Sequence, residues 1–290
     1  MGLRVGFIGG GMMCQVGHLP FYVKDHRCEV VAVAESRPSL IEELSSWLGP
    51  ERVVTDYRAL LADTRIDAVV VSTPRPATGP LTLEAIEAGK HVFAEKPMAH
   101  TAAQAERLVT AAEQKGVYYC VGYMKRFDPG IQAVKRLFDE IVTTGTLGRL
   151  LCARFYDFSK SYAVPVPAHK RPTESRTVRF AEWPLWPDWL PPDRRGLYAW
   201  FLNAACHDVN LLRLFFPDEV EVASVQCPSD AAVSASCRSR EVSIEFAVAK
   251  TAAGRWIEGG EFLFERGRLA FEIPSPMDVT GVTHLILDHE

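Results

Sequence analysis

Residues 5–20 of this 290-residue chain read VGFIGGGMMCQVGHLP, and this stretch decides the fold that the sequence predicts. The apolar run from Val5 to Ile8 is typical of a buried strand, and Gly9 and Gly11 follow it at once, before a helix-like segment. This is the context that the dinucleotide-binding motif G-x-G-x-x-G requires. The first glycine permits the tight turn, and the second lets the backbone approach a pyrophosphate at the helix N-terminus. A small thiol, Cys14, takes the third glycine position, and a glycine turn without a ligand is the weaker alternative.

The same alternation of strand and helix continues downstream. Short apolar runs predict four more strands, at 29–34, 67–72, 91–94 and 117–121. Capping boxes predict helices that begin after Ser39 and Thr101. Near-continuous apolar strands that alternate with helices favour a parallel sheet covered on both faces. We therefore predict an α/β fold, with a doubly wound Rossmann domain over residues 1–121.

Glu35, at the end of the second predicted strand, bears on the choice of cofactor. It follows Gly11 by about 24 residues, close to the spacing of the ribose-binding acid of Rossmann domains. A carboxylate there accepts hydrogen bonds from the ribose of NAD and repels the extra phosphate of NADP. Arg37 weakens this preference, because an arginine can pair with that phosphate. The sequence therefore favours NAD, with NADP possible.

Composition and charge exclude several classes of protein. Hydrophobic residues make up 48% and charged residues 23%, which is typical of a globular chain and not of a disordered one. The net charge of -4 lacks the basic excess of proteins that bind nucleic acid. No stretch approaches the ~18 apolar residues of a membrane span, and nothing resembles a signal peptide. The seven cysteines form no C-x-x-C pair, so we expect reduced thiols in the cytoplasm and no metal site.

Motifs further along the chain carry a family resemblance. Residues 89–99 read GKHVFAEKPMA, 122–129 read GYMKRFDP, and 205–213 read ACHDVNLLR. With the glycine turn and the Ser-Thr-Pro run at 72–74, they resemble the glucose–fructose oxidoreductase / inositol dehydrogenase / MocA (Gfo/Idh/MocA) family from residue 3 to about 273. The tripeptide EKP is the most specific of these matches.

The resemblance implies a second, α/β domain with a mostly antiparallel open sheet, here residues 122–290, and an active site between the domains. It implies an NAD(P)-dependent dehydrogenase or reductase that acts on a secondary alcohol or ketone of a sugar, nucleotide sugar or cyclitol. Many members are homodimers or homotetramers built through the sheet. Relatives continue with a further helix and strand, so this chain is expected to be short at its C-terminus.

Two rival functions stay open. One is a catalytically silent protein that senses a sugar or dinucleotide, and the other is an NAD-dependent glycosidase. Asn203 and the short C-terminus favour the first, whereas the intact EKP tripeptide and His207 oppose it.

Lys96 of the EKP tripeptide is a candidate catalytic residue. It follows a predicted strand at its carboxyl end, where open α/β sheets bind ligands. An ammonium there can hydrogen-bond the reacting oxygen and stabilise its alkoxide character. The resemblance implies that Lys96 contacts both substrate and cofactor, while Glu95 orients the lysine or the ribose; a surface lysine is the weaker alternative. The residues expected to contact the cofactor are Gly9, Gly11, Met12, Met13, Glu35, Thr73, Pro74, Glu95 and Lys96.

A second candidate group lies on a helix predicted around 199–216. Asn203, His207 and Asn210 are spaced four and three residues apart, which places them on one face. The opposite face carries the apolar stripe Leu202, Ala205, Val209, Leu212 and Phe216. Since the unperturbed pKa of histidine is about 6.5, His207 is the candidate general acid and base.

Asn203 departs from the family pattern, which usually has aspartate at this position. An amide can orient a hydroxyl group but cannot take up a proton, so the usual proton relay is in doubt. Without His207 as the base, the proton would pass to Lys96 or to a tyrosine: Tyr123, Tyr162 or Tyr198.

Other candidate substrate contacts come from a loop rich in tryptophan and from Arg126. Four of the six tryptophans lie between residues 183 and 200, in a stretch whose prolines prevent a helix over most of its length. The rings of Trp183 and Trp186 are expected to pack on a sugar. An oligomer interface or a cap on the sheet is an equal alternative. Arg126 faces either the substrate or solvent. The residues expected to contact the substrate are Lys96, Arg126, Trp183, Trp186, Asn203, His207 and Asn210.

Overall fold

The computed structural model of the chain describes residues 2–159, 174–251, 256–276, 278 and 280–289. The chain divides into two compact units. The first comprises Met1–Gly122 with Pro165–Leu190, and the second comprises Tyr123–Val164 with Pro191–Glu290. The first unit thus contains residues 174–190 in addition to its N-terminal part. The domain boundary between residues 121 and 122 stays a prediction.

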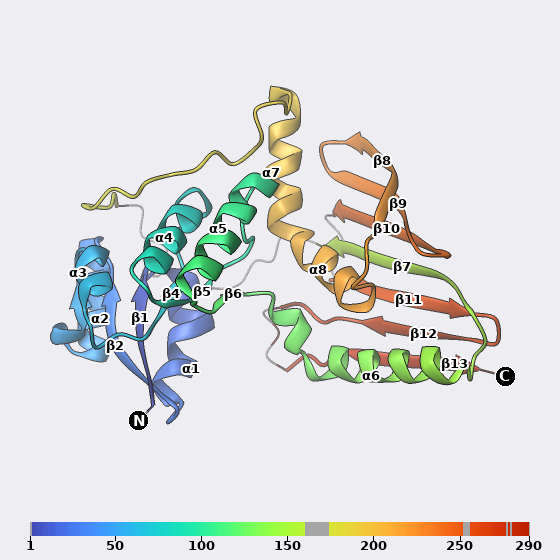
Figure 1. Cartoon of the computed structure of the whole chain (residues 1–290), viewed down its shortest axis with the longest axis horizontal. Helices are drawn as coiled ribbons and strands as arrows, with labels where there is room; N and C mark the ends of the chain where they lie inside the picture. Colours follow the sequence, from blue (N-terminus) through green and yellow to red (C-terminus); the bar gives the residue numbers. More distant parts are fainter. Residues whose placement is uncertain (1, 160–173, 252–255, 277, 279, 290) are drawn as a thin grey trace. The chain divides into compact units, whose positions relative to one another are not determined.

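The first unit contains a six-stranded sheet in the order β3-β2-β1-β4-β5-β6, and every pair is parallel (Figure 1). The strands are β1 (Leu3–Ile8), β2 (Cys28–Ala34), β3 (Val53–Val54), β4 (Ala68–Val71), β5 (His91–Ala94) and β6 (Tyr119–Val121). This confirms the predicted doubly wound sheet. The short β3 has too few residues to show a periodic pattern in the sequence. The strand order reverses between β1 and β4, and ligands of such sheets bind at this switch point.

Helices cover both faces of this sheet. They are η1 (Cys14–His18), α1 (Leu19–Lys24), α2 (Pro38–Leu48), η2 (Pro50–Arg52), α3 (Tyr57–Ala62), α4 (Arg75–Glu87) and α5 (Ala102–Lys115). The alternation along β1 places Phe7 in one buried cluster and Ile8 in another, so each face has its own core. The N-cap predicted at Thr101 is confirmed, because its hydroxyl accepts a hydrogen bond from Gln104 N.

The N-cap predicted at Ser39 is wrong. Helix α2 begins one residue earlier, at Pro38, with Arg37 as its N-cap. Proline suits the first helical position because its fixed φ fits the helix and its missing N–H has no intrahelical partner there. Ser39 therefore lies inside the first turn.

The second unit contains a seven-stranded sheet in the order β13-β12-β11-β7-β10-β9-β8. Only β7 and β10 pair in parallel, and the other pairs are antiparallel, which confirms the predicted mostly antiparallel sheet. The strands are β7 (Leu150–Ser159), β8 (Glu221–Ser229), β9 (Ala232–Ser239), β10 (Val242–Lys250), β11 (Glu258–Phe264), β12 (Gly267–Glu272) and β13 (His284–His289).

The helical elements of the second unit are η3 (Met124–Phe127), α6 (Pro129–Thr144), η5 (Pro192–Arg194), α7 (Arg195–Ala204) and α8 (Cys206–Phe215). Helix α6 packs along β12 and β13 (Figure 1). The carboxylate of Asp128 caps α6 by accepting from Ile131 N at 3.0 Å. Phenylalanine rings fill the core between helices and sheet: Phe138, Phe155, Phe215, Phe262 and Phe271.

The single helix predicted around 199–216 is two helices. The chain changes direction at Ala205, where ψ is -9°, and α8 begins at the next residue (Figure 1). Beyond the break, Leu212 and Phe216 of the predicted apolar stripe are buried, but the stripe does not hold at every position. Val209, which that stripe places in the core, is 38% exposed, whereas His207 and Asp208 are buried.

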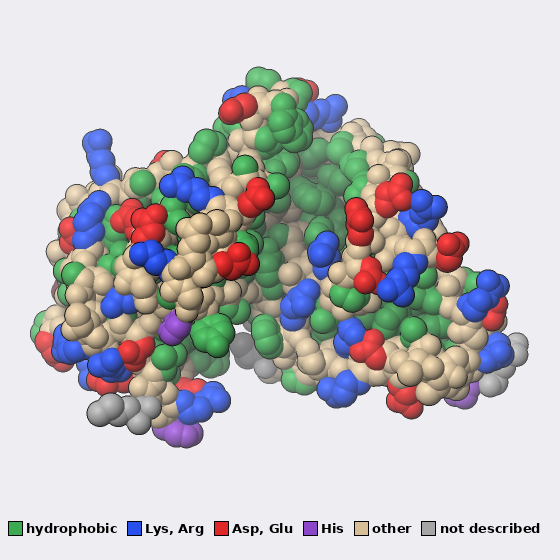
Figure 2. Space-filling view, in the orientation of Figure 1, with side chains coloured by type: hydrophobic (Ala, Val, Ile, Leu, Met, Phe, Trp, Pro, Cys, Tyr) green, Lys and Arg blue, Asp and Glu red, His purple; other side chains and the backbone are tan. Residues whose placement is uncertain are grey.

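The surface shows no separation of charge on the face drawn in Figure 2, where Lys and Arg side chains are interspersed with Asp and Glu side chains. Within the described ranges, every helix is too short or too polar to traverse a lipid bilayer.

Candidate functional site

The glycine turn after β1 has the geometry that a phosphate-binding turn requires. Gly9 has a φ of +95°, and a Cβ there would lie 2.2 Å from Ser72 O, so no other residue fits. A Cβ on Gly11 would meet only the Arg37 guanidinium, at 3.4 Å. The backbone at Gly11 is thus open on the side where a pyrophosphate would approach, and these residues fit a dinucleotide. The two methionines of the turn follow directly, and Met13 is partly exposed.

Glu35 lies in the turn after β2, and its carboxylate is already fully engaged. It accepts hydrogen bonds from Gly10 N at 3.1 Å and from Ser36 N at 2.8 Å. Arg37 binds the same carboxylate through Nε at 2.9 Å and Nη2 at 2.6 Å. Burial raises the pKa of Glu35, but the Arg37 guanidinium outweighs it and the net shift is downward. Glu35 therefore joins the glycine turn to Arg37.

The EKP segment follows β5, and its acid connects it to the first helix. His18 Nε2 lies 2.7 Å from Glu95 Oε1, while Glu95 Oε2 accepts from Lys96 N at 3.2 Å. The His18 ring also packs edge-on against Phe93. The Lys96–Pro97 peptide bond is cis. Glu95 thus contacts both His18 and the backbone of Lys96, and its role in orienting the lysine side chain or the ribose stays a prediction.

Thr73 and Pro74, after β4, form the third part of this unit's candidate site. Thr78 Oγ1, in the first turns of α4, donates to Thr73 O at 3.2 Å, and Pro74 O accepts from Ala77 N at 2.9 Å. These bonds fix the loop beside Gly9 at the switch point. The first unit therefore brings the glycine turn and the loop after β4 together at the carboxyl ends of the strands.

Trp183 packs inside the first unit. Its backbone N donates to Pro76 O at 2.8 Å, and a Cβ on Gly79 of α4 would lie 2.4 Å from its ring. The Arg107 guanidinium lies over the same ring, 5.4 Å from its centroid. Trp186 is half-buried and Trp189 is 76% exposed. A role of Trp183 and Trp186 in substrate binding stays a prediction.

In the second unit, η3 and the residue before it pack on α8. The rings of Tyr123 and His207 meet edge-to-face with centroids 6.2 Å apart. Arg126 donates through Nε to Asn210 Oδ1 at 2.5 Å and through Nη2 to Asn210 O at 3.2 Å. Asn203 lies on α7, on the other side of the break at Ala205. Tyr162, one of the alternative bases, lies outside the described residues.

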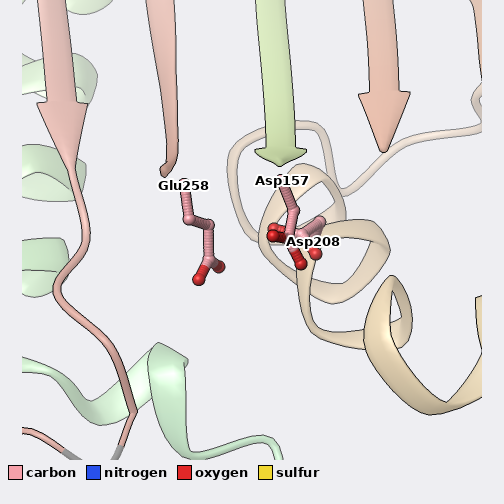
Figure 3. Close-up of side chains that lie close together, drawn as sticks. All are labelled: Asp157, Asp208 and Glu258. Atoms are coloured by element: carbon pink, nitrogen blue, oxygen red, sulfur yellow. The ribbon is translucent and has the colours of Figure 1, made fainter. Parts of the chain in front are cut away.

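A buried ionic cluster includes Asp208, the residue that follows His207 on α8. Its carboxyl groups come from three elements, Asp157 on β7, Asp208 on α8 and Glu258 on β11, and they lie within 4.8 Å of one another (Figure 3). Lys125 of η3 forms an ion pair with Glu258. Glu258 also accepts from Trp256 Nε1 at 2.8 Å. The ammonium supplies the positive charge in this cluster, so these carboxyl groups give no reason to place a metal ion here.

Burial sets the charge of the cluster. It raises the pKa of Asp157 to about 7 and that of Asp208 well above its usual range, and the neighbouring carboxylates add to both shifts. Burial lowers the pKa of Lys125, but the charge of Glu258 outweighs it and the pKa is raised. The cluster therefore combines the Lys125–Glu258 ion pair with two carboxyl groups, Asp157 and Asp208, whose pKa values are raised.

Several of these residues escaped the sequence analysis. His18 lies in the glycine segment, and Lys125 and Asp208 lie next to the candidate residues Arg126 and His207. His18 and its partner Glu95 are 77 residues apart, and Lys125 and its partner Glu258 are 133 residues apart. No spacing rule connects residues at such distances along the chain.

Comparisons with known proteins agree with this geometry. Residues 3–123 match the family model described as an oxidoreductase family with an NAD-binding Rossmann fold. A levoglucosan dehydrogenase of Pseudarthrobacter phenanthrenivorans is 30% identical over 159 residues, 52% of this chain and 40% of that protein. An inositol 2-dehydrogenase of Acidothermus cellulolyticus is 29% identical over 225 residues, 77% of this chain and 56% of that protein. The chain spans about half the length of the curated relatives it matches.

Solved structures show the same fold over the whole chain. A 3-ketoreductase from Actinomadura kijaniata in complex with NADP and TDP-benzene superimposes with a TM-score of 0.76 at 21% identity. The match covers 100% of this chain and 82% of that chain. Together, the comparisons confirm the predicted fold and the expected dinucleotide-binding domain.

Proposed function

We propose that the chain is an NAD(P)-dependent dehydrogenase or reductase of the Gfo/Idh/MocA oxidoreductase family, which the match of residues 3–123 to the oxidoreductase family model supports. Its substrate is a secondary alcohol or ketone of a sugar, nucleotide sugar or cyclitol. The observation that carries this proposal is the phosphate-binding turn at Gly9 and Gly11 together with the EKP segment, whose lysine backbone is held by Glu95. The names of the relatives, which include sugar and inositol dehydrogenases, support the substrate class.

In this proposal, Lys96 acts on the reacting oxygen. Its ammonium donates a hydrogen bond to that oxygen and stabilises the negative charge that develops as the C–H bond breaks. The bound nicotinamide supplies or accepts the hydride. The hydrogen bond from Lys96 N to Glu95 anchors the backbone from which the lysine side chain extends.

His207 exchanges the proton of the substrate hydroxyl, and the two asparagines orient it. The edge contact with Tyr123 fixes the plane of the His207 ring. The side-chain oxygen of Asn210 already accepts a hydrogen bond from Arg126. The amide nitrogen of Asn210 is therefore the group that donates to a substrate hydroxyl. Arg126 is then a positioning residue for Asn210.

The partners and location of the protein complete the proposal. All seven cysteines are free thiols, which is typical of the cytoplasm. We propose a homodimer or homotetramer, built through the seven-stranded sheet, and no nucleic acid or membrane partner.

The variant Lys96→Ala tests the catalytic role. We expect turnover to fall by orders of magnitude while the dissociation constant of NAD(P)H stays near the wild-type value, because the reacting oxygen loses its donor. The assay follows NADH or NADPH absorbance over a panel of sugars, ketosugars and cyclitols, with the exposed Lys115→Ala as the control.

The outcomes separate the rival functions. Turnover of Lys96→Ala like that of the wild type would rule out the role of Lys96. Dinucleotide binding without turnover of any substrate would indicate a sensor, and release of an aglycone without net change in NADH would indicate a glycosidase.

A further inference from the structure

His18 is a residue of the glycine segment that the proposed function does not use. It is the last residue of η1 (Cys14–His18), a single π-helical turn in which Leu19 N donates to Cys14 O, five residues back. Such turns are rare, and they occur frequently at functional sites. At His18 the backbone leaves the helical conformation, with a φ of -126° and a ψ of -67°, before α1 begins. The π turn and this break set the direction in which the His18 side chain leaves the backbone.

The ring of His18 contacts two side chains at the carboxyl end of β5. It packs edge-on against Phe93, with ring centroids 5.5 Å apart. Its Nε2 donates to Glu95 Oε1 at 2.7 Å, a distance typical of a charge-assisted hydrogen bond. Because Phe93 and Glu95 are two residues apart in extended chain, they lie on the same face. The side chains of His18 and Glu95 are only 13% and 17% exposed, so water competes little for this bond.

Glu95 joins His18 to the backbone of Lys96. Its second oxygen, Oε2, accepts from Lys96 N at 3.2 Å. The backbone of Glu95 is itself held by the sheet, because Glu95 N donates to Val71 O at 2.9 Å. That bond leaves the torsions of the Glu95 side chain open, and the bond from His18 restricts them. With one oxygen on His18 and the other on Lys96 N, the carboxylate keeps a single orientation.

The other end of η1 is bonded to the glycine turn. Gln15 Nε2 donates to Gly10 O at 2.9 Å, and Gln15 N donates to Gly11 O at 3.0 Å. The Gln15 side chain is buried. One short helical turn therefore connects the turn that fits a pyrophosphate with the acid that precedes the lysine. All of these residues lie in the first unit.

We propose that His18 is a positioning residue for Lys96 and acts through Glu95. This inference rests on the proposed function, in which the Lys96 ammonium donates to the reacting oxygen. The N–H of His18 holds the Glu95 carboxylate, the carboxylate holds the N–H of Lys96, and the lysine side chain extends from a fixed backbone. Without His18 the carboxylate is free to turn, and this anchor is lost. A displacement of about 1 Å at reacting groups can lower turnover by about 100-fold.

Two variants separate the hydrogen-bond donor from the ring. His18→Phe keeps an aromatic ring against Phe93 and removes the donor. His18→Gln has no ring, but its amide nitrogen can donate from a position close to that of Nε2. We expect His18→Phe to lower kcat by about tenfold or more, while KM and the dissociation constant of NAD(P)H change by less than about threefold. We expect His18→Gln to recover most of the lost kcat.

The measurements are steady-state NAD(P)H absorbance, with a substrate from the panel of sugars, ketosugars and cyclitols, and fluorescence titration with NAD(P)H. The control His26→Phe replaces an exposed histidine of the first unit and is expected to leave kcat, KM and the dissociation constant unchanged. A residue that only supports the fold would lower the unfolding temperature without this selective loss of kcat.

The backbone amide of Lys96 tests the same connection without turnover. Protein labelled with ¹⁵N-lysine gives amide signals of lysines alone, and the signal that is missing from Lys96→Arg belongs to Lys96. We expect His18→Phe to move this signal upfield, because an amide proton is less deshielded when its hydrogen bond is lost. His18→Gln should leave it near the wild-type position. The signal of the exposed Lys115 should stay in place in every variant.

Each outcome supports or overturns the proposal. A kcat of His18→Phe like that of the wild type, or an unmoved Lys96 signal, would overturn it. A fall in NAD(P)H affinity as large as the fall in kcat would assign His18 to the cofactor turn instead. A loss of kcat in His18→Gln as large as that in His18→Phe would show that the ring matters and not the donor.

Two further outcomes are covered. If His18→Phe does not fold, His18→Asn replaces it, since its amide is one methylene shorter than that of His18→Gln and does not reach Glu95. If the wild type turns over no substrate of the panel, the proposed function fails, and the Lys96 signal alone decides whether His18 holds the lysine backbone.

Discussion

Asp157 shows how one buried carboxyl group links folding to pH. Its pKa is raised to about 7 by burial and by the neighbouring Glu258, whereas in an unfolded chain it returns to about 3.9. Between about pH 4 and pH 7 the folded protein holds a proton that the unfolded chain has released. Stability therefore falls as pH rises through this range and levels off above it.

The variant Asp157→Asn removes this dependence, because an amide resembles the protonated acid. We expect the loss of Tm between pH 5 and pH 8 to be smaller in the variant by several degrees, since about 1 kcal/mol corresponds to about 2–4 °C for a chain of this size. Differential scanning fluorimetry over a pH series measures it. The exposed Asp230→Asn is the control, and parallel pH profiles of wild type and Asp157→Asn would contradict the prediction.

At the scale of elements, the contact between α4 and the tryptophan loop depends on one glycine. Alanine favours a helix over glycine, so Gly79→Ala would stabilise an isolated α4. In the folded unit the added Cβ would lie 2.4 Å from the rigid Trp183 ring, and either the helix or the loop must move. We therefore expect Gly79→Ala to destabilise the protein by about 1–3 kcal/mol, measured by urea unfolding.

Two comparisons isolate the steric cause. Gly196→Ala, on α7, has open space around its Cβ and should cause no loss of stability. In a Trp183→Ala background the penalty of Gly79→Ala should disappear, because the obstacle is gone. A penalty that persists in that background would show that the ring is not its cause.

At the scale of the whole molecule, each unit has a hydrophobic core of its own. We therefore expect two calorimetric unfolding transitions. NADPH should raise the midpoint temperature of the transition that belongs to the first unit and leave the other unchanged. At a ligand concentration 100 times the dissociation constant the stabilisation is about 2.7 kcal/mol. A single transition, or an equal shift of both, would contradict the prediction.

Gly11→Ala tests whether the glycine turn causes that shift. In the absence of ligand its Cβ meets only a guanidinium at 3.4 Å, so the variant should unfold near the wild-type temperature. A methyl group on this turn blocks the approach of a pyrophosphate, and the shift with NADPH should be lost. Gly196→Ala should keep the full shift.

The parallel sheet and the phosphate-binding turn could be predicted from the sequence alone, and its motifs resemble the Gfo/Idh/MocA family. These features depend on residues close together in the chain: the apolar period of a strand, a glycine that needs a positive φ, and a capping threonine. The mostly antiparallel sheet was expected from the family resemblance, because its strands pair over long distances that no local pattern encodes.

Only the tertiary structure decided how charged side chains pair and which faces are buried. The break at Ala205 divides the predicted polar face: Asn203 lies on α7 and is half-buried, whereas His207 is buried on α8 next to the buried Asp208. The carboxylate of Glu35 is paired with Arg37. The ammonium of Lys125, a residue type that usually lies at the surface, is buried and paired with Glu258. A carboxylate or ammonium takes its charge and its partners from the groups that the fold brings within a few ångströms, and sequence spacing does not carry that information.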